Sequence, residues 1–565
     1  MGEGAVVLRF LGNIAAVATV VSLLGLGASC GGTRPATRAF PDRPVAWLEH
    51  DDGDVAQPPA DTGLVDLDFS IVLRDSLAGE MDYYLTLEGR RPARDVNALD
   101  EVPCSTWFCP RNHLRPLTPA EAAAGSAGLP PRLPLRIVKG KVRGAALGYE
   151  VRDADGRKFL LKPDVAGHAG MASAAEVIGD RIFHAAGYNV PSSFALDLDP
   201  RTDVVVDPSA TYTLYEVQHR PLTAAHVQAQ LAASARGPDG RVRAVAVDWL
   251  PGKIVGAFDM IGRRPDDPND RIPHEQRRSL RASRLLFAWL AVMDAGALNT
   301  LDAYVQENGR RFVRHYFIDF GAGLGSSTTH PKGPEQGQEH LVEVGRSLAS
   351  LASLGFYRRP YERQRDSWAR VNAAHPQLGW FAAEDFNPDE FRTGEKVPAH
   401  RRMTDRDAYW GAKVVTSFSD AQIAAIVAEA RLPASEAAYL TRTLGIRRDI
   451  VGRRYLRAVT AVEAPRASAD GRAVCFDDLA ITRGYAAPGE VRYAVTVDDH
   501  AGRVAAFAVP ATGASTCVTL PPTRGPYRVV GVATEWLANG HEPRRVKGAR
   551  IHLAGEKVIG LERDD

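Results

Sequence analysis

The chain has 565 residues, of which 45% are hydrophobic and 24% are charged, a composition typical of a globular protein long enough to form several domains. Its 69 Lys and Arg residues nearly balance its 68 Asp and Glu residues. Because there is no overall positive field, we expect no nucleic-acid binding and no general attraction to an anionic membrane.

An apolar run from Ile14 to Ala28 is about as long as the core of a signal peptide and shorter than the ~20 residues of a membrane-spanning helix. It ends in Leu26-Gly-Ala-Ser-Cys30. This pattern resembles a bacterial lipoprotein signal, with residues 1–30 as the signal and Cys30 as the lipidated residue. Two departures are a leucine one position too far from the cysteine and a leading segment whose only cation is Arg9.

The lipoprotein resemblance implies a protein of the bacterial cell envelope, with the membrane as a partner through a lipid anchor. Gly31, rather than an aspartate, follows the cysteine, which implies delivery to the outer membrane. An uncleaved anchor and an ordinary secretory signal are the alternatives. All three place most of the chain outside the cytoplasm.

The chain has five cysteines. Without Cys30, an even set remains, and we expect two disulfides in an oxidising compartment, Cys104 with Cys109 and Cys475 with Cys517. The alternative for the first pair is half of a zinc site with His113, but no second ligand pair has zinc spacing.

Two segments follow the signal. Residues 31–62 are rich in Gly, Pro and Asp, which predicts a flexible tether. Residues 63–135 form an N-terminal extension, in which apolar alternation around 69–73 and 83–87 predicts strands. Within it, the stretch 95–103 suggests no role.

The segment 136–250 begins with a glycine-spaced turn between two strand-like runs. Gly140 and Gly144 belong to this turn, whose backbone amides are suited to covering phosphate groups. Next comes Phe159-Leu-Leu-Lys162, a strand pattern that places Leu160 and Lys162 on one face, an apolar side chain beside an ammonium group.

A helix is predicted from about residue 169 to 186, closed by Gly187, because apolar residues recur there at helical spacing. Glu176 lies on this helix and is the candidate partner of Lys162. Asp180, on the same helix, is the competing carboxylate.

The segment 251–455 is predicted to be mainly helical, and three acidic or amide residues stand out in it. Asp294 and Asn299 are separated by four residues, and Asp319 begins an Asp-Phe-Gly triplet. Between Asn299 and Asp319, the dipeptide Asn308-Gly309 separates two strand-like runs, which is a strong hairpin signal.

In this order, these motifs resemble the working parts of protein-kinase-like phosphotransferases. The resemblance spans about residues 136 to 455 and implies a two-lobed fold that uses ATP and Mg²⁺. It gives Lys162 to the nucleotide phosphates and Glu176 to that lysine. It makes Asp294 the residue that orients the acceptor, and Asn299 and Asp319 the metal ligands.

The departures from ordinary protein kinases are also informative. No His-Arg precedes Asp294, and the stretch to Asp319 is longer than usual. Both features resemble the atypical HipA-like and phosphoinositide-kinase-like branches. We exclude Asp302 from the site, since an acid at the start of a hairpin strand more often bonds the turn or faces water.

Three further patterns lie in the large lobe. Arg277, Arg278, Arg281 and Arg284 recur at helical spacing, and we expect them on the solvent face of a helix. Residues 326–337 lie where kinases carry an activation loop, but we expect an ordinary surface loop. The pattern from Ser419 to Gln422 predicts a capping box that starts a helix.

From residue 456 to 565, short Val- and Ala-rich runs alternate with Gly, Pro and Asp turns. This spacing predicts a small, all-β, sandwich-like domain that contains Cys475 and Cys517. The fold class expected for the whole chain is therefore α+β, with a two-lobed kinase-like core, a helical large lobe and this β domain.

The function that follows is an exported, lipid-anchored protein whose kinase-like domain transfers a phosphoryl group from a Mg²⁺-bound nucleotide to an acceptor that the sequence does not name. Its protein partners are not indicated either. The alternative is a non-catalytic, pseudokinase-type binding or structural lipoprotein. Because an envelope compartment is poor in ATP, either the domain meets a nucleotide or another phosphate donor there, or the fold is kept for binding, or the anchor prediction is wrong. The enzyme hypothesis requires Lys162, Asp294, Asn299 and Asp319 to converge.

Overall fold

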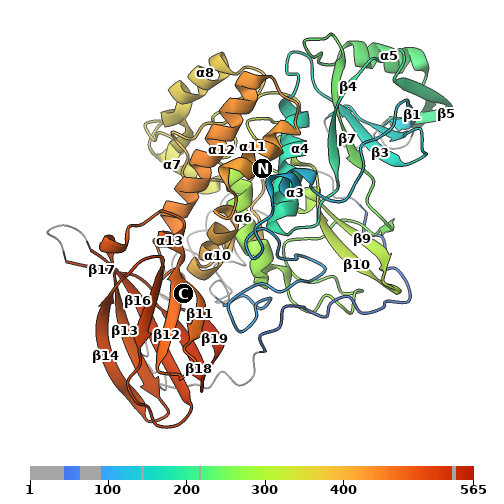
Figure 1. The fold of residues 1–565 in the computed structure, drawn as a ribbon. Helices are drawn as coiled ribbons and strands as arrows, with labels where there is room; N and C mark the ends of the chain where they lie inside the picture. The colour runs from blue at the N-terminus through green and yellow to red at the C-terminus, as the bar shows by residue number, and fades with distance from the viewer. Residues whose placement is uncertain (1–43, 64–90, 141–145, 215–217, 538–541) are drawn as a thin grey trace, which may run out of the picture.

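The computed structural model describes residues 44–63, 91–140, 146–214, 218–537 and 542–565. These residues form a small lobe built on a sheet, a mainly helical large lobe, and a C-terminal β domain on the opposite side of the large lobe (Figure 1). The expected α+β class, with a mainly helical large lobe and a β-rich C-terminal part, is confirmed. Cys30, Gly144 and the strands expected at 69–73 and 83–87 lie outside the described residues.

The small lobe is a seven-stranded sheet in the order β4-β7-β3-β2-β1-β5-β6. Its strands are β1 (Leu135–Gly140), β2 (Tyr149–Arg152), β3 (Lys158–Pro163), β4 (Ser193–Leu198), β5 (Val204–Leu214), β6 (Gln218–Pro221) and β7 (Val242–Asp248), and its helices are α4 (Met171–Ala186) and α5 (Ala224–Ala232). β3 runs antiparallel between β2 and β7, so the lysine strand is central.

Alternation along β3 decides which side chains face the site. Phe159 and Leu161 are fully buried in the core of the small lobe, whereas Leu160 and Lys162 share the opposite, partly exposed face. The helix that follows ends as predicted at Gly187. That residue has a φ of +133°, and its amide donates to the carbonyls of Phe183 and His184.

The large lobe contains a three-stranded sheet in the order β10-β9-β8 and most of the helices. Its strands are β8 (Lys253–Ile254), β9 (Thr300–Glu307) and β10 (Arg310–Phe317), and its helices are α6 (Arg278–Leu290), α7 (Val344–Ala352), α8 (Arg365–Ala374), α9 (Pro398–Arg401), α10 (Asp405–Val415), α11 (Asp420–Ala428) and α12 (Ala434–Tyr455). Among the described residues, no helix has both the length and the apolar character that a membrane crossing needs.

Two local predictions in this lobe are confirmed. β9 and β10 pair antiparallel from Glu307 with Arg310 down to Thr300 with Phe317, and Asn308 and Gly309 both have positive φ, as a two-residue hairpin turn requires. At the start of α11, the hydroxyl of Ser419 accepts from the amide of Gln422, and the Gln422 side chain accepts from the amide of Ser419.

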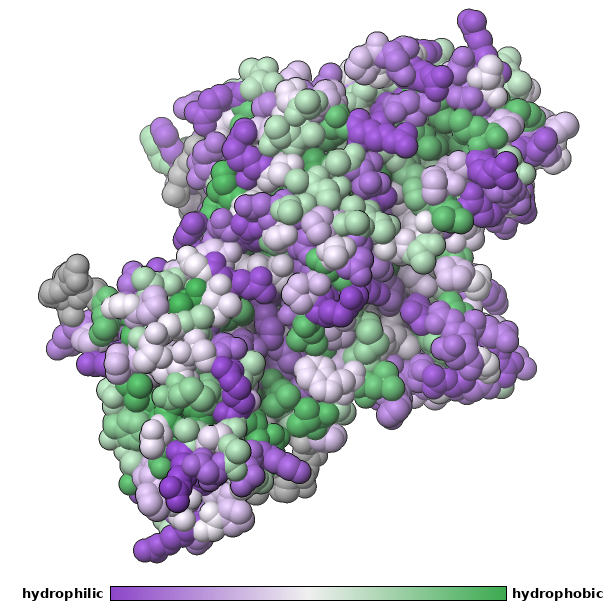
Figure 2. All heavy atoms as spheres, viewed as in Figure 1, coloured by the Kyte–Doolittle hydropathy of each residue, from purple (hydrophilic) through white to green (hydrophobic). Residues whose placement is uncertain are grey.

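The C-terminal domain consists of two sheets, β11-β12-β15 and β14-β13-β16-β18-β19, with β17 paired to β16. Its elements are β11 (Val462–Ala467), β12 (Ala473–Asp478), α13 (Leu479–Thr482), β13 (Val491–Asp499), β14 (Gly502–Pro510), β15 (Ser515–Thr519), β16 (Tyr527–Trp536), β17 (Arg544–Arg545), β18 (Ala549–Ala554) and β19 (Lys557–Arg563). Hydrophobic residues reach the surface of this domain over β13 and β14 (Figure 2), where Val504 and Phe507 are exposed.

Both expected disulfides are present. Cys475 and Cys517 face each other on the paired strands β12 and β15, and Cys104 is bonded to Cys109 in the N-terminal extension. The thiolates that a zinc site with His113 would need are therefore used in a disulfide.

The described part of the expected tether, residues 44–62, is not free. The amide of Glu49 donates to the carbonyl of Cys104, the amide of Val55 to Arg311 on β10, and the amide of Thr62 to Val255. The carboxylate of Asp51 accepts from the hydroxyl and the amide of Thr106. These residues lie along the large lobe and the extension, because their backbone groups find partners there.

The expectation that the arginines of α6 face water is wrong. Arg277, Arg278 and Arg281 are each 0–1% exposed. The stretch 95–103, for which the sequence suggested no role, covers this side of the helix. Asp95 accepts from the amides of Arg278 and Ser279 and so caps the start of α6 from a distant part of the chain.

A buried carboxylate, that of Asp100, pairs with Arg278 and with two arginines of other elements. It lies 2.8 Å from a guanidinium nitrogen of Arg278 on α6, 2.8 Å from Arg406 on α10 and 2.7 Å from Arg563 on β19. Burial raises the pKa of Asp100, but the three guanidinium groups outweigh this effect and hold the pKa well below its usual range. One side chain therefore joins the extension, the large lobe and the C-terminal domain.

Replacing Asp100 with Asn is expected to lower the free energy of unfolding by about 3–5 kcal/mol, because three buried guanidinium groups lose their common carboxylate. Urea denaturation at pH 7 measures the change. Asp470→Asn, at an exposed turn, is the matched control and should leave the unfolding midpoint unchanged. A midpoint for Asp100→Asn equal to that of the control would contradict the role given to Asp100.

Candidate active site

Lys162 lies between two carboxylates that come from distant parts of the chain. Its Nζ is 3.1 Å from Oε2 of Glu176 on α4 and 2.9 Å from Oδ1 of Asp319. Burial lowers the pKa of Lys162, but the charges of Asp319 and Glu176 outweigh this and hold the pKa above its usual value. The side chain is therefore an ammonium group at the junction of β3, α4 and the Asp-Phe-Gly segment.

The position of α4 against the Asp-Phe-Gly segment depends on Gly179. A Cβ at that position would lie 2.5 Å from Cβ of Phe320, so only glycine lets the phenylalanine pack directly on the helix. The ring of Phe320 also lies 4.6 Å from that of Phe183, one turn further along α4. This packing positions α4 so that the Glu176 side chain reaches Lys162.

The competing carboxylate on α4, that of Asp180, does not reach the lysine. It accepts from Arg181 and from the hydroxyl of Ser193 on β4, and burial raises its pKa to about 7. Asp302 is also accounted for. It is fully buried, 3.0 Å from Arg264 and 2.6 Å from His315, and so is part of the packing beneath the hairpin.

The hairpin brings Asn299 beside Asp319. Asn299 ends a short 3-10 turn directly before β9, and its carbonyl accepts from the amide of Ile318, the residue before Asp319. Asp319 itself has a left-handed backbone, with φ of +60° and ψ of +65°, which turns the chain sharply as it leaves β10. The two residues predicted as metal ligands are thus held together by backbone bonding.

Asp294 faces the same space. The side-chain amide of Asn299 donates to the Asp294 carbonyl at 3.0 Å, which fixes the loop between them. Burial, followed by the negative charge of Asp319, raises the pKa of Asp294. The structure therefore brings together Lys162, Glu176, Asp294, Asn299 and Asp319, as the kinase resemblance requires.

The donor set at this site fits a hard cation such as Mg²⁺. Asp319 supplies carboxylate oxygens on a side chain that is 35% exposed. The side-chain nitrogen of Asn299 donates to the backbone carbonyl of Asp294, so it is the side-chain oxygen of Asn299 that would bind a metal ion. Mg²⁺ commonly takes one or two protein oxygens and fills its shell with water and substrate phosphates. No group of three or more His, Cys, Asp or Glu side chains suited to a metal occurs among the described residues, so a purely protein-made metal cage is not present there.

The glycine turn is only partly described. Gly140 ends β1, and a Cβ there would lie 2.9 Å from Cβ of Tyr212 on β5, so close packing is the observed reason for this glycine. Gly144 falls in 141–145, outside the described residues. The strands on either side, β1 and β2, pair antiparallel as the turn prediction requires.

The sequence analysis missed Lys332, which lies in the segment after Asp-Phe-Gly. It is 1% exposed, and its ammonium group donates to the carbonyl of Ala291 at the end of α6. Burial lowers its pKa to about 7, against the opposing effect of Asp294. The expectation of an ordinary surface loop is therefore wrong at this residue. The only sequence signal was a single lysine in a stretch of Gly, Thr and Pro.

No family model matches the chain, and no curated protein matches it. Among solved structures, the Golgi casein kinase is similar over 70% of this chain and 95% of its own, with 9% identity and a TM-score of 0.28. The Golgi casein kinase with Mn/ADP bound is similar over 65% of this chain and 96% of its own, with 11% identity and a TM-score of 0.24. Such low TM-scores carry no argument about fold or function, which therefore depend on the geometry of the chain itself.

Gly179→Ala is expected to push α4 away from Phe320 and to lower the free energy of unfolding by about 1–3 kcal/mol, as overpacking does. Gly445→Ala on α12 is the matched control, because the nearest atom to its Cβ would be an ordinary 3.6 Å away. The control should gain up to about 1 kcal/mol from the helix preference of alanine. Urea denaturation of both variants checks the prediction, and a stabilising effect at both positions would contradict it.

Lys332 is expected to make stability depend on pH between about 7 and 10. Its folded pKa of about 7 lies below the unfolded value of about 10.4, so in this range the unfolded chain binds the extra proton. The free energy of unfolding should therefore rise with pH, by up to about 1.4 kcal/mol per unit, relative to Lys332→Met. Denaturation curves at pH 7, 8 and 9 measure this difference.

Lys557→Met, at an exposed position of β19, is the control for the substitution itself and is measured at the same three pH values. If the difference between the wild type and Lys332→Met is the same at all three pH values, Lys332 does not titrate in this range.

Proposed function

We propose that this chain is an atypical kinase-like phosphotransferase that uses a nucleotide and a divalent metal ion. The single observation that carries the proposal is the bridging position of Lys162, which contacts a helix carboxylate and the Asp-Phe-Gly aspartate at once. The lysine–glutamate pair and the metal-holding aspartate must both be in place for phosphoryl transfer in protein kinases. Three separate parts of the chain, β3, α4 and the segment after β10, supply these three residues.

Each residue has a role in the proposed reaction. The ammonium group of Lys162 holds nucleotide phosphates, and Glu176 keeps it oriented. Asp294 orients the acceptor hydroxyl and accepts its proton as the hydroxyl oxygen bonds to the terminal phosphorus and the bond to the leaving nucleoside diphosphate breaks. Bound Mg²⁺, held by Asp319 and Asn299, would offset negative charge on the phosphate oxygens.

The proposed setting is the bacterial cell envelope, with a lipid anchor at Cys30. The two disulfides support it, because disulfides persist in oxidising compartments. Such a compartment is poor in ATP, so the donor has to be tested directly with several nucleoside triphosphates. The non-catalytic alternative predicts nucleotide binding, or no binding, without turnover.

Mg²⁺ with ATP is expected to raise the melting temperature of the wild type, since a ligand at 100 times its Kd adds about 2.7 kcal/mol to the free energy of unfolding. Asp319→Ala should lose most of this response, because it removes a metal ligand and a partner of Lys162. Asp239→Ala, at an exposed turn of the small lobe, is the control and should respond like the wild type.

An activity measurement separates the two functions. Asp294→Asn should bind Mg²⁺ and ATP but hydrolyse ATP about 10²–10⁴-fold more slowly than the wild type, the range that proton transfer contributes. Equal thermal responses of the wild type and Asp319→Ala to Mg²⁺ with ATP would rule out the proposed nucleotide site. Binding without hydrolysis by the wild type, with every nucleotide tested, would leave the non-catalytic alternative.

A further inference from the structure

A hollow of about 370 Å³ lies on the large lobe, beside the candidate active site. It is formed where α6, α9 and the loop 389–397 meet. Its lining includes Arg284, Asp389, Arg392, Thr393, His400 and Arg401. We call this hollow the arginine pocket.

The charge of the arginine pocket is unbalanced. Three arginines line it against a single aspartate, Asp389. That carboxylate is already engaged, because it lies 2.5 Å from Nε of Arg454 and accepts from the hydroxyl of Tyr455 at 2.7 Å. Asp389 also interacts electrostatically with Arg284, but it is shared with Arg454, so it offsets only part of the positive charge of the lining.

The guanidinium groups of Arg284 and Arg392 bond to backbone rather than to acids. Both donate to the carbonyls of Asp389 and Phe391, and no ion pair involves either arginine among the described residues. Burial, followed by the positive charges of Arg284 and Arg346, lowers the pKa of Arg392, against a smaller effect of Glu343 and Glu390. Like charges are thus held together in a site where an anion would relieve their repulsion.

His400 also lines the arginine pocket and is 7% exposed. The hydroxyl of Ser283 donates its proton to the carbonyl of Leu280, so Nε2–H of His400 donates to the Ser283 oxygen at 3.0 Å. Nδ1 is then an acceptor, and it has no hydrogen-bond partner. The P–OH group of a hydrogen phosphate is a donor that fits this atom.

The arginine pocket lies next to Asp294, the residue proposed to orient the acceptor. Thr393 lines the pocket, and the next residue, Gly394, donates its amide to the carbonyl of Met293, directly before Asp294. A Cβ at Gly394 would lie 3.9 Å from Oδ1 of Asp294. A molecule whose hydroxyl group reaches Asp294 could therefore place a second group in the arginine pocket.

We propose that the arginine pocket is an acceptor subsite that binds a phosphate-class dianion, so that the acceptor of the proposed phosphotransfer already carries a phosphate group. This inference rests on the proposed function for its role in the reaction. Several guanidinium groups converging on one hollow fit the multiple oxygens of a phosphate, which accept paired hydrogen bonds from arginine.

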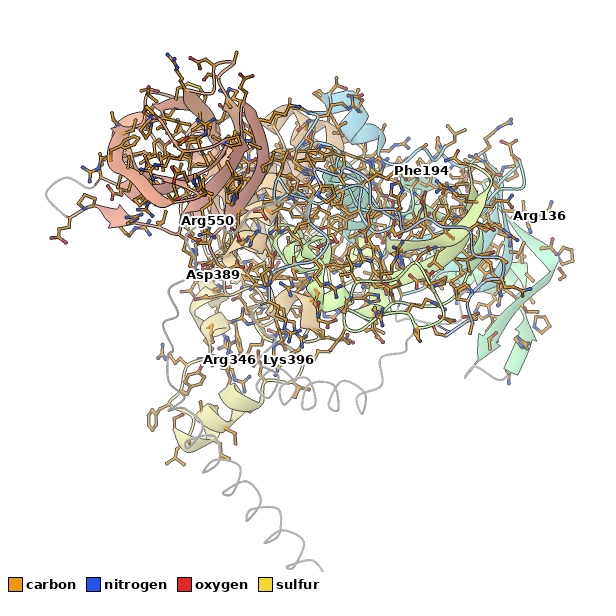
Figure 3. All side chains as sticks on the ribbon, turned by 90° about the horizontal axis from the view of Figure 1, so that it is seen from below. Arg136, Phe194, Arg346, Asp389, Lys396 and Arg550 are labelled. Atoms are coloured by element: carbon orange, nitrogen blue, oxygen red, sulfur yellow. A yellow bond between two sulfur atoms is a disulfide. The ribbon has the colours of Figure 1, made fainter. Side chains whose placement is uncertain are left out.

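Inorganic phosphate is the first probe, with binding measured by titration calorimetry at constant ionic strength set with NaCl. Arg392→Gln should weaken phosphate binding by about tenfold or more, since hydrogen bonds to charged groups contribute roughly 1.5–3 kcal/mol. Arg392 is partly exposed and lies in a loop, so this variant is expected to fold; Arg284→Gln is the second variant. Arg136→Gln is the control, because Arg136 lies at the far end of the small lobe from Asp389 (Figure 3) and should bind phosphate like the wild type.

Two further arms identify where the anion binds and what it is. Lys162→Met should lose the response to Mg²⁺ with ATP but keep phosphate binding, so failure of the nucleotide site and failure of the arginine pocket give different results. Phosphoserine should bind at least as well as inorganic phosphate, and acetate at equal ionic strength should bind about tenfold more weakly or not at all.

The proposal is overturned if phosphate fails to bind the wild type, if Arg392→Gln and Arg284→Gln bind it as the wild type does, or if binding is lost in Lys162→Met instead. Acetate binding as strong as phosphate binding would overturn the assignment to a phosphate-class ligand. Phosphate binding that weakens in the pocket variants, and persists in Lys162→Met and Arg136→Gln, supports it.

Discussion

The carboxylate of Asp100 is the point on which the arrangement of the chain depends. It neutralises guanidinium groups from α6 and α10 of the large lobe and from β19 of the C-terminal domain. On α6 its partner is Arg278, while the other buried arginine of the helix, Arg281, lies 3.2 Å from Asp407, so each of the two has an acid beside it. Asp294 is the fourth residue after the end of α6. The position of the candidate site therefore depends on a cluster of buried charges that lies outside the site.

The site itself is assembled from short pieces that are fixed by backbone bonding. β3 sets the direction of Lys162, the packing of Phe320 on Gly179 sets the height of Glu176, and the β9–β10 hairpin sets Asn299 beside Asp319. Lys332 joins the segment after Asp319 to the end of α6 by a bond to a backbone carbonyl. If any of these elements moved, the shape of the space beside Asp294 would change. The packing of the lobes therefore determines the geometry of the candidate site.

Local patterns predicted the parts of the structure that local forces determine. The turn at Asn308 and Gly309, the end of the helix at Gly187 and the cap at Ser419 follow from preferences that a few neighbouring residues express. The order of Lys162, Asp294, Asn299 and Asp319 added the hypothesis that these residues converge. In the structure Lys162 contacts Asp319, and the Asn299 side chain donates to the carbonyl of Asp294.

Local patterns do not predict which part of the chain covers a given face of a helix. Helical spacing showed that Arg277, Arg278 and Arg281 share one side of a helix, but a stripe of arginines is equally compatible with water or with buried acids. The acids come from distant parts of the chain on both sides, because Asp100 lies 178 positions before Arg278 and Asp407 lies 126 positions after Arg281. Lys332 was missed for the same reason, because its burial results from packing between α6 and the loop after β10.

The bond between Asp100 and Arg563 joins residues 463 positions apart. Until β19 has left the ribosome, this acid can meet only part of its set of bases. We therefore expect assembly to finish late and slowly, because loop closure over such a separation costs entropy before any contact offsets it. Dissection is also constrained: the small and large lobes expressed without the β domain would contain an incompletely neutralised buried acid, so the smallest unit that folds faithfully includes β19.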